Sequence, residues 1–111
     1  MTAETAAVLP ALMVVLAAAL WAITVVNTHL RCVDAARAGA RAAARGEPLA
    51  QVRERTKALA PRGAQIDIAR GPETIRVDIT ARAHPPWASA LPAVEVTASA
   101  ISDMEPGAAQ P

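Results

Sequence analysis

Two side chains that can bind metal ions stand close together near the middle of the chain. His29 and Cys32 are three residues apart, so they share one face of a helix. Zinc sites normally use three or four protein ligands, and His84 is distant in the sequence. We therefore expect no metal site here. Cys32 is expected to be a small apolar helix residue, and His29 to lie at a membrane interface.

Catalytic patterns are also missing from the sequence. It contains no Gly-rich phosphate loop, no Gly-x-Ser-x-Gly and no His-Glu-x-x-His, so we expect no catalytic residue, no cofactor and no small-molecule substrate. The net charge is only +1, and no aromatic residues are interleaved with the basic ones, which argues against nucleic-acid binding. These observations favour a protein that is not an enzyme.

An uncharged apolar run from Ala6 to Val26 is the strongest signal in the chain. About twenty apolar residues in a helix cross a hydrocarbon core of about 30 Å. The run therefore predicts a transmembrane helix. Trp21 lies within it and is expected to be an anchor near the membrane interface.

Glu4, just before the run, has two possible roles. A carboxylate in a first helical turn is favoured by the helix dipole alone. An ionisable residue at the edge of an apolar helix can instead mark a pairing site, here for an amine of a neighbouring subunit. Pro10 removes one backbone donor and should bend or loosen the helix.

The helix is expected to continue beyond the membrane to Arg45, about 65 Å in all, because Gly46 and Pro48 are typical C-terminal stop signals. Charged residues mark the surface of its second half, and the first two can pair: Asp34, Arg37, Arg41 and Arg45. The opposite side is expected to carry Leu30, Val33, Ala36, Ala40 and Ala43.

The remaining residues predict a small soluble domain. A short helix is expected from Pro48 to Ala60, with Leu49, Val52 and Leu59 on one face. The apolar period then changes to two, which predicts a hairpin of strands around residues 66–68 and 75–79 and a third strand over 94–99. Residues 84–87 are expected to form a loop, with Trp87 plugging the edge of the core.

The predicted fold class is α+β and pilin-like: a long membrane-inserted helix followed by a short helix and a three-stranded antiparallel sheet. Residues 1–28 form the transmembrane half of the helix and 29–46 its emerging amphipathic half. Residues 47–104 form the soluble domain, and residues 105–111 are expected to be a disordered tail.

Two stretches of the long helix resemble the TadE-like minor pilins of the bacterial tight-adherence (Flp) pilus, a type IV pilus-like system. Glu4 is followed by five mostly apolar residues and Pro10, and residues 35–45 are similar to the Ala-Arg-Gly-Ala-Arg pattern where that helix leaves the membrane. The resemblance covers residues 2–46.

The resemblance implies a structural role in pilus assembly and cell adhesion. It implies a leader upstream of Met1, cleaved by a prepilin peptidase, and a soluble domain outside the cell membrane. Helix packing would then draw the subunit into the pilus beside other pilins, on an assembly platform. Glu4 would pair with the N-terminal amine of a neighbour.

Charge distribution supports a different topology. Arg31, Arg37, Arg41 and Arg45 all follow the apolar run and no basic residue precedes it, so the positive-inside rule places the soluble domain in the cytoplasm. The alternative function is therefore a single-pass, membrane-anchored interaction protein unrelated to pili. A cleaved signal peptide is disfavoured, because the run lacks a basic start and is long.

Overall fold

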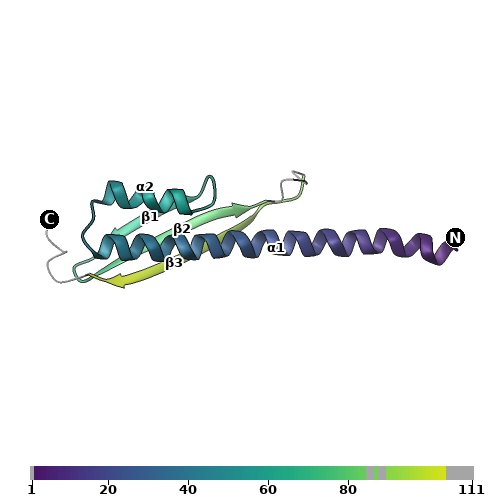
Figure 1. Ribbon diagram of the computed structural model, residues 1–111, viewed down its shortest axis with the longest axis horizontal. Helices are drawn as coiled ribbons and strands as arrows, with labels where there is room; N and C mark the ends of the chain where they lie inside the picture. Colours follow the sequence, from purple (N-terminus) through teal and green to yellow (C-terminus); the bar gives the residue numbers. More distant parts are fainter. Residues whose placement is uncertain (1, 85–86, 88–89, 105–111) are drawn as a thin grey trace.

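A computed structural model describes residues 2–84, 87 and 90–104 of the chain. The molecule is elongated, 73 × 20 × 16 Å, with one long helix running along its whole length (Figure 1). The described residues form α1 (Ala3–Ala44), α2 (Leu49–Leu59), β1 (Gln65–Arg70), β2 (Thr74–Ala83) and β3 (Val94–Asp103).

Local signals fix both ends of α1. The Thr2 hydroxyl caps the helix by accepting a hydrogen bond from the Thr5 backbone N–H at 3.3 Å. At the other end Gly46 adopts a positive φ of 86°, and its N–H donates to the Ala43 carbonyl. Pro10 lies inside the helix without ending it.

The strands form one antiparallel sheet in the order β1-β2-β3. The β1–β2 pairing sets Ile68 opposite Val77, and the Gly71 N–H donates to the Thr74 carbonyl at the turn. The β2–β3 pairing runs as far as Ala83 opposite Val94. This last pair determines where the loop between β2 and β3 begins.

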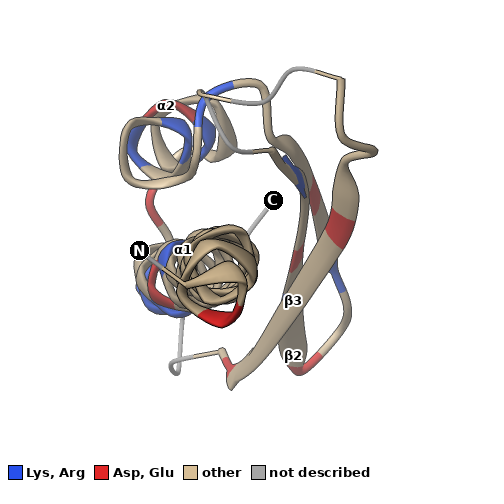
Figure 2. Cartoon of the chain, turned by 90° about the vertical axis from the view of Figure 1, so that its right-hand side faces the viewer, with Lys and Arg blue, Asp and Glu red and all other residues tan. Residues whose placement is uncertain are grey.

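Both helices lie on the same side of the sheet (Figure 2). The C-terminal part of α1 packs on β2 and β3, and α2 lies beside α1. The core combines β-branched strand residues with very small helix residues, including Ile75, Val77, Ile79, Cys32, Ala36 and Ala40. Because the helix residues are small, α1 can approach the sheet closely.

Gly39 marks the closest approach of α1 to α2. A Cβ placed on Gly39 would lie 2.5 Å from Oγ1 of Thr56. Thr56 is buried, and its hydroxyl is satisfied by donating to the Val52 carbonyl at 2.7 Å. The absence of a side chain at residue 39 therefore permits this helix crossing.

The predicted α+β fold class is confirmed: a long apolar N-terminal helix, a short helix and a three-stranded antiparallel sheet are all present. The strands β2 and β3 are longer than the alternating sequence pattern indicated. The predicted tail, residues 105–111, lies outside the described residues.

The large apolar residues of the two helices differ in their burial. Leu30 is exposed on α1, and Leu49 and Leu59 are exposed on α2, whereas Val52 of the same predicted face is buried. Thr56 takes a place in the α2 contact face because it lies one turn after Val52 and its hydroxyl bonds within the helix.

Trp87 is also misplaced by the sequence pattern. It was expected to plug the edge of the small core, but its exposed fraction is 52%. The buried residues of the core in this region are instead Ala81 and Ala83 of β2 with Val96 of β3.

Candidate functional site

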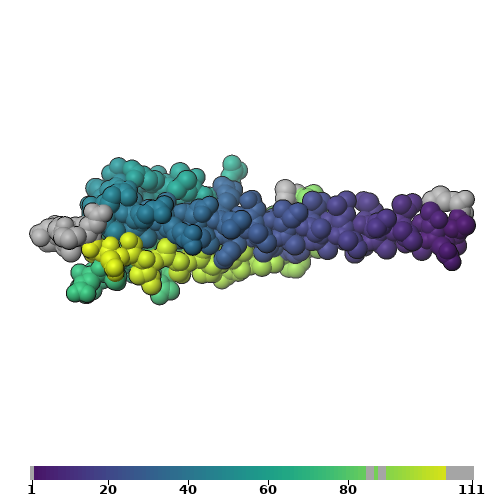
Figure 3. Space-filling view, turned by 60° about the horizontal axis from the view of Figure 1, so that its bottom comes forward, coloured from purple at the N-terminus to yellow at the C-terminus, as the bar shows by residue number. Residues whose placement is uncertain are grey.

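The N-terminal half of α1 extends away from the sheet and α2 (Figure 3). We call residues 3–26 the free half of α1. None of its residues is buried, and its large apolar side chains point in all directions around the helix. The most exposed include Val8, Leu12, Met13, Val14, Val15 and Ile23.

The C-terminal part, residues 32–44, has the opposite character, and we call it the packed half. Its buried residues are all small: Cys32, Gly39 and six alanines, Ala35, Ala36, Ala40, Ala42, Ala43 and Ala44. Its exposed side carries the predicted surface charges Asp34, Arg37 and Arg41, with Arg45 following at the C-cap.

The charges around the end of α1 pair locally. The Arg45 guanidinium donates to the Glu47 carboxylate at 2.7 Å, and Arg55 of α2 contacts the other oxygen of Glu47 at 3.0 Å. This network joins the end of α1 to α2. Within the described residues Asp34 and Arg37 form no ion pair with each other, because both project from the helix into solvent.

Glu4 and Pro10 both lie at the far end of the free half and are exposed. In the described part of the chain, no cation pairs with Glu4.

His29 and Cys32 have different surroundings in the structure. Cys32 is buried against the sheet, whereas His29 is exposed, and no group of three metal-binding side chains occurs in the described residues. Burial raises the pKa of the Cys32 thiol, with a smaller opposing effect from Arg31. Cys32 therefore packs as a small residue of the helix, as the sequence predicts.

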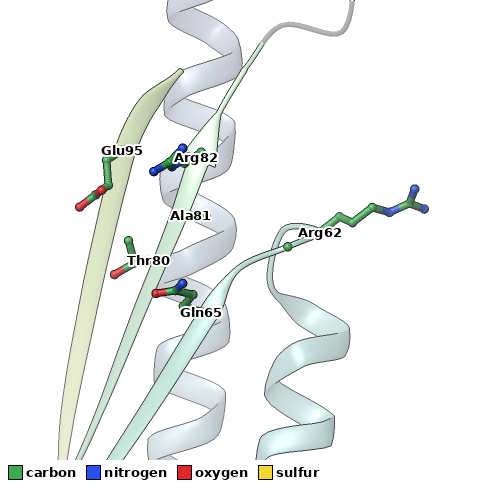
Figure 4. Close-up of a pocket in the computed structure, with 7 residues that line it drawn as sticks. Arg62, Gln65, Thr80, Ala81, Arg82 and Glu95 are labelled. Carbon is green, nitrogen blue, oxygen red and sulfur yellow. The ribbon is translucent and has the colours of Figure 1, made fainter. Parts of the chain in front are cut away.

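A shallow polar pocket lies on the outer face of the sheet (Figure 4). It is lined by Gln65, Thr80, Arg82 and Glu95, while the Arg62 side chain points away from it. Arg82 and Glu95 stand opposite each other on β2 and β3. These side chains come from the outward positions of the strands, and their opposite charges leave no excess for binding an ionic ligand.

Another outward position holds a small hydrogen-bond network. Asp78 accepts from the Ser99 hydroxyl across the strand pair and from Nε of Arg76 at 3.0 Å. These bonds lower the pKa of the Asp78 carboxyl, with Ser99 as the larger cause. The arrangement is exposed and is best explained as cross-strand stabilisation.

An apolar pocket that sequence patterns did not suggest lies between the free half and the loop after β2. Val14, Ala17, Ala18 and Trp21 form its α1 side. The described loop residues Trp87, Ala90 and Leu91 form much of the other side, together with residues 92–94. The one sequence signal for this contact was that the loop lacks charge.

These features define a class: an α+β protein with one helix, within the described residues, that is long and apolar enough to cross a membrane. The Mycobacterium tuberculosis (strain ATCC 25618 / H37Rv) protein named "Apoptosis inhibitor Rv3655c" is 36% identical over 104 residues, covering 94% of this chain and 78% of the relative. The chain belongs to the family of that protein. No family model and no solved structure matches it.

This relationship corrects the assignment to the TadE-like minor pilins. The relative carries a different name, and no family model supports the pilin assignment. The motif consisted of one carboxylate, one proline and an arginine-alanine pattern. None of these features is specific to one family, because alanine is the best helix former and arginine is common where helices leave a membrane.

Proposed function

We propose that this chain is a non-enzymatic, membrane-anchored structural subunit that assembles with other subunits into a pilin-type filament through its N-terminal helix. The observation that carries the proposal is the free half of α1, an apolar surface that the described residues leave largely exposed. In water such a surface is strongly unfavourable, so lipid or neighbouring helices must cover it.

The architecture supports lateral packing. The packed half fixes the soluble domain at one end of the rod, and the free half extends from it as a separate surface. Neighbouring copies can therefore align their free halves without disturbing their domains. Glu4, unpaired within the described chain, would be neutralised by an amine from a neighbour.

Cysteine cross-linking in the native membrane tests this packing. Cys32 is the one natural cysteine and is buried, so background cross-linking should be low. Val8→Cys, on the free half, should give cross-linked species with an oxidant. Lys57→Cys, exposed on α2, is the matched control and should stay monomeric. Absence of Val8→Cys cross-links in membranes that contain the protein would contradict assembly.

Glu4 gives a second test. Glu4→Ala should leave membrane insertion intact and reduce the amount of subunit in the assembled polymer, because the amine of the neighbour loses its counter-charge. Glu54→Ala, an exposed carboxylate removed from α2, should change neither quantity. Equal polymer levels for the two variants would rule out the pairing role.

The arginine distribution favours a second candidate function, an anchored interaction protein with a cytoplasmic domain. Arg31, Arg37 and Arg41 follow the free half, and basic residues concentrate on the cytoplasmic side of membrane helices. Digestion of the domain by external protease in intact spheroplasts would exclude this candidate, and full protection would favour it.

A further inference from the structure

The two tryptophans of the chain lie on opposite sides of one apolar pocket, although they are far apart in sequence. Trp21 belongs to the free half of α1, and Trp87 belongs to the loop between β2 and β3. The pocket has a volume of about 710 Å³. Trp87 also lines a second apolar space with Met13, Leu16 and Leu20 of α1, so it faces the free half over several helical turns.

The segment that carries Trp87 has the composition of a membrane-facing surface. Residues 83–94 contain no Asp, Glu, Lys or Arg, whereas Arg82 and Glu95 flank them directly. Leu91 is 42% exposed and Val94 is also exposed, and both line the pocket. An uncharged loop with exposed Trp and Leu side chains is unfavourable in water, yet it is the part of the domain nearest the free half.

The level of this loop along α1 is fixed by the residues it borders. At 1.5 Å per residue, Trp21 lies about 26 Å along the helix from Glu4, close to the thickness of a hydrocarbon core. If Glu4 lies among the headgroups on one side, Trp21 reaches the boundary on the other side. Trp87 lies beside the stretch of α1 that ends at Trp21, because it lines apolar spaces formed by residues 13–21 of the helix.

The described residues between β2 and β3 belong to no helix or strand, and this limits how deep they can lie. Lipid-exposed loops do not occur in the hydrocarbon core, because their N–H and C=O groups would lack partners. At the interface, water still reaches those groups. Tryptophan concentrates at this depth, and Pro85, Pro86 and Pro92 carry no backbone N–H that would need a partner.

The geometry points to a second membrane contact: the loop between β2 and β3 inserts Trp87 and Leu91 into the headgroup–acyl boundary beside Trp21, and lipid acyl chains fill the pocket between loop and helix. This inference rests on the proposed membrane anchoring of the free half. Lipid is the inferred occupant because the pocket opens beside the free half, so the medium that surrounds this helix also surrounds the loop.

The contact has a structural consequence for the domain. A single helix would leave the domain free to tilt on its anchor. Two tryptophans from separate segments instead hold the end of the sheet against the bilayer. The domain-side boundary of the membrane span then lies near Trp21, several residues before the end of the apolar run at Val26.

Lipid quenching of tryptophan fluorescence tests the inference with the full chain. Trp21→Phe leaves only Trp87 as an emitter, and Trp87→Phe leaves only Trp21. Each variant is reconstituted in phosphatidylcholine vesicles with or without bromine near the top of the acyl chains. We expect both tryptophans to lose emission in brominated vesicles to a similar extent and both spectra to be shifted to the blue.

The other outcomes distinguish the two proposals. If Trp21 is quenched and Trp87 is not, the loop contact is wrong and the membrane anchor stands. If neither is quenched, the anchor itself fails. If Trp87 is protected from both brominated lipid and aqueous acrylamide, another protein chain covers the loop, and lipid is not the occupant.

A charge substitution provides the matched control. In the Trp21→Phe background, Leu91→Glu should reduce the lipid quenching of Trp87, because a carboxylate pulls the loop toward water. Leu59→Glu, at a position of similar exposure on α2, 47%, should leave the quenching unchanged. Equal quenching in the two variants would overturn the role of the loop.

Discussion

The two halves of α1 share one continuous backbone and a high alanine content, but their surroundings are opposite. In the packed half, small side chains are buried and the surface carries charge. In the free half, large apolar side chains are exposed on every side. Side-chain size therefore separates the two roles, because small residues permit close packing on a sheet and large ones increase the apolar area available to lipid.

This contrast predicts that replacing a large apolar side chain by alanine lowers the free energy of unfolding by different amounts in the two regions. Ile79, fully buried where the sheet meets the packed half, should lose about 2–5 kcal/mol of unfolding free energy on Ile79→Ala. Leu12, 57% exposed on the free half, should lose less than about 0.5 kcal/mol on Leu12→Ala. Denaturant unfolding in detergent micelles measures both, and similar costs would break the distinction.

Enlarging an alanine sharpens the comparison within α1 itself. Ala36→Leu should destabilise the domain by about 1–3 kcal/mol, because the residue is fully buried against the sheet. Ala11→Leu adds the same atoms to an exposed position of the free half and should leave the thermal midpoint of the domain unchanged. A tolerated Ala36→Leu would show that α1 does not approach the sheet closely.

The crossing of α1 and α2 allows a double-mutant cycle. Gly39→Ala should lower the free energy of unfolding by about 1–2 kcal/mol, because the new methyl group would clash with Oγ1 of Thr56. The cost of this clash exceeds the gain in helix propensity from glycine to alanine. Removing the hydroxyl in Gly39→Ala/Thr56→Ala should recover most of this loss. If the losses of unfolding free energy of the two single variants simply add in the double variant, the cost of Gly39→Ala does not come from contact with Thr56.

The smallest effect concerns the outer face of the sheet. Because its hydrogen bonds lower the pKa of Asp78 in the folded state, Asp78 stabilises the fold above the ordinary carboxyl pKa. That contribution is lost as the pH falls through the lowered folded-state value. Asp78→Asn should therefore reduce stability at neutral pH by under about 1 kcal/mol and flatten its acid dependence.

Much of this fold could be predicted from local signals. The end of α1 follows from Gly46 and Pro48, and the hairpin follows from alternating Ile and Val residues around a Gly-Pro turn. These features depend on neighbours in the sequence. The candidate site was visible in the same way, because an uncharged apolar run is itself a sequence property.

Features set by three-dimensional packing could not be predicted. Alanines are so frequent that their spacing does not identify the buried face, and Trp87 was expected to plug the edge of the core although its side chain is exposed. The position of the loop beside Trp21 depends on how far β2 and β3 remain paired, which the alternating pattern underestimated.

The central claim is that the two halves of α1 have different surroundings: lipid covers the free half, and the protein's own sheet and α2 cover the packed half. Vesicle flotation of Val15→Arg tests it most directly, with Asp34→Arg, an exposed position of the packed half, as the control. An arginine at the centre of a membrane helix costs about 2.5–3.5 kcal/mol. Val15→Arg should lose most vesicle binding while its domain stays folded, and Asp34→Arg should float like the natural protein; equal flotation of the two variants would contradict the account.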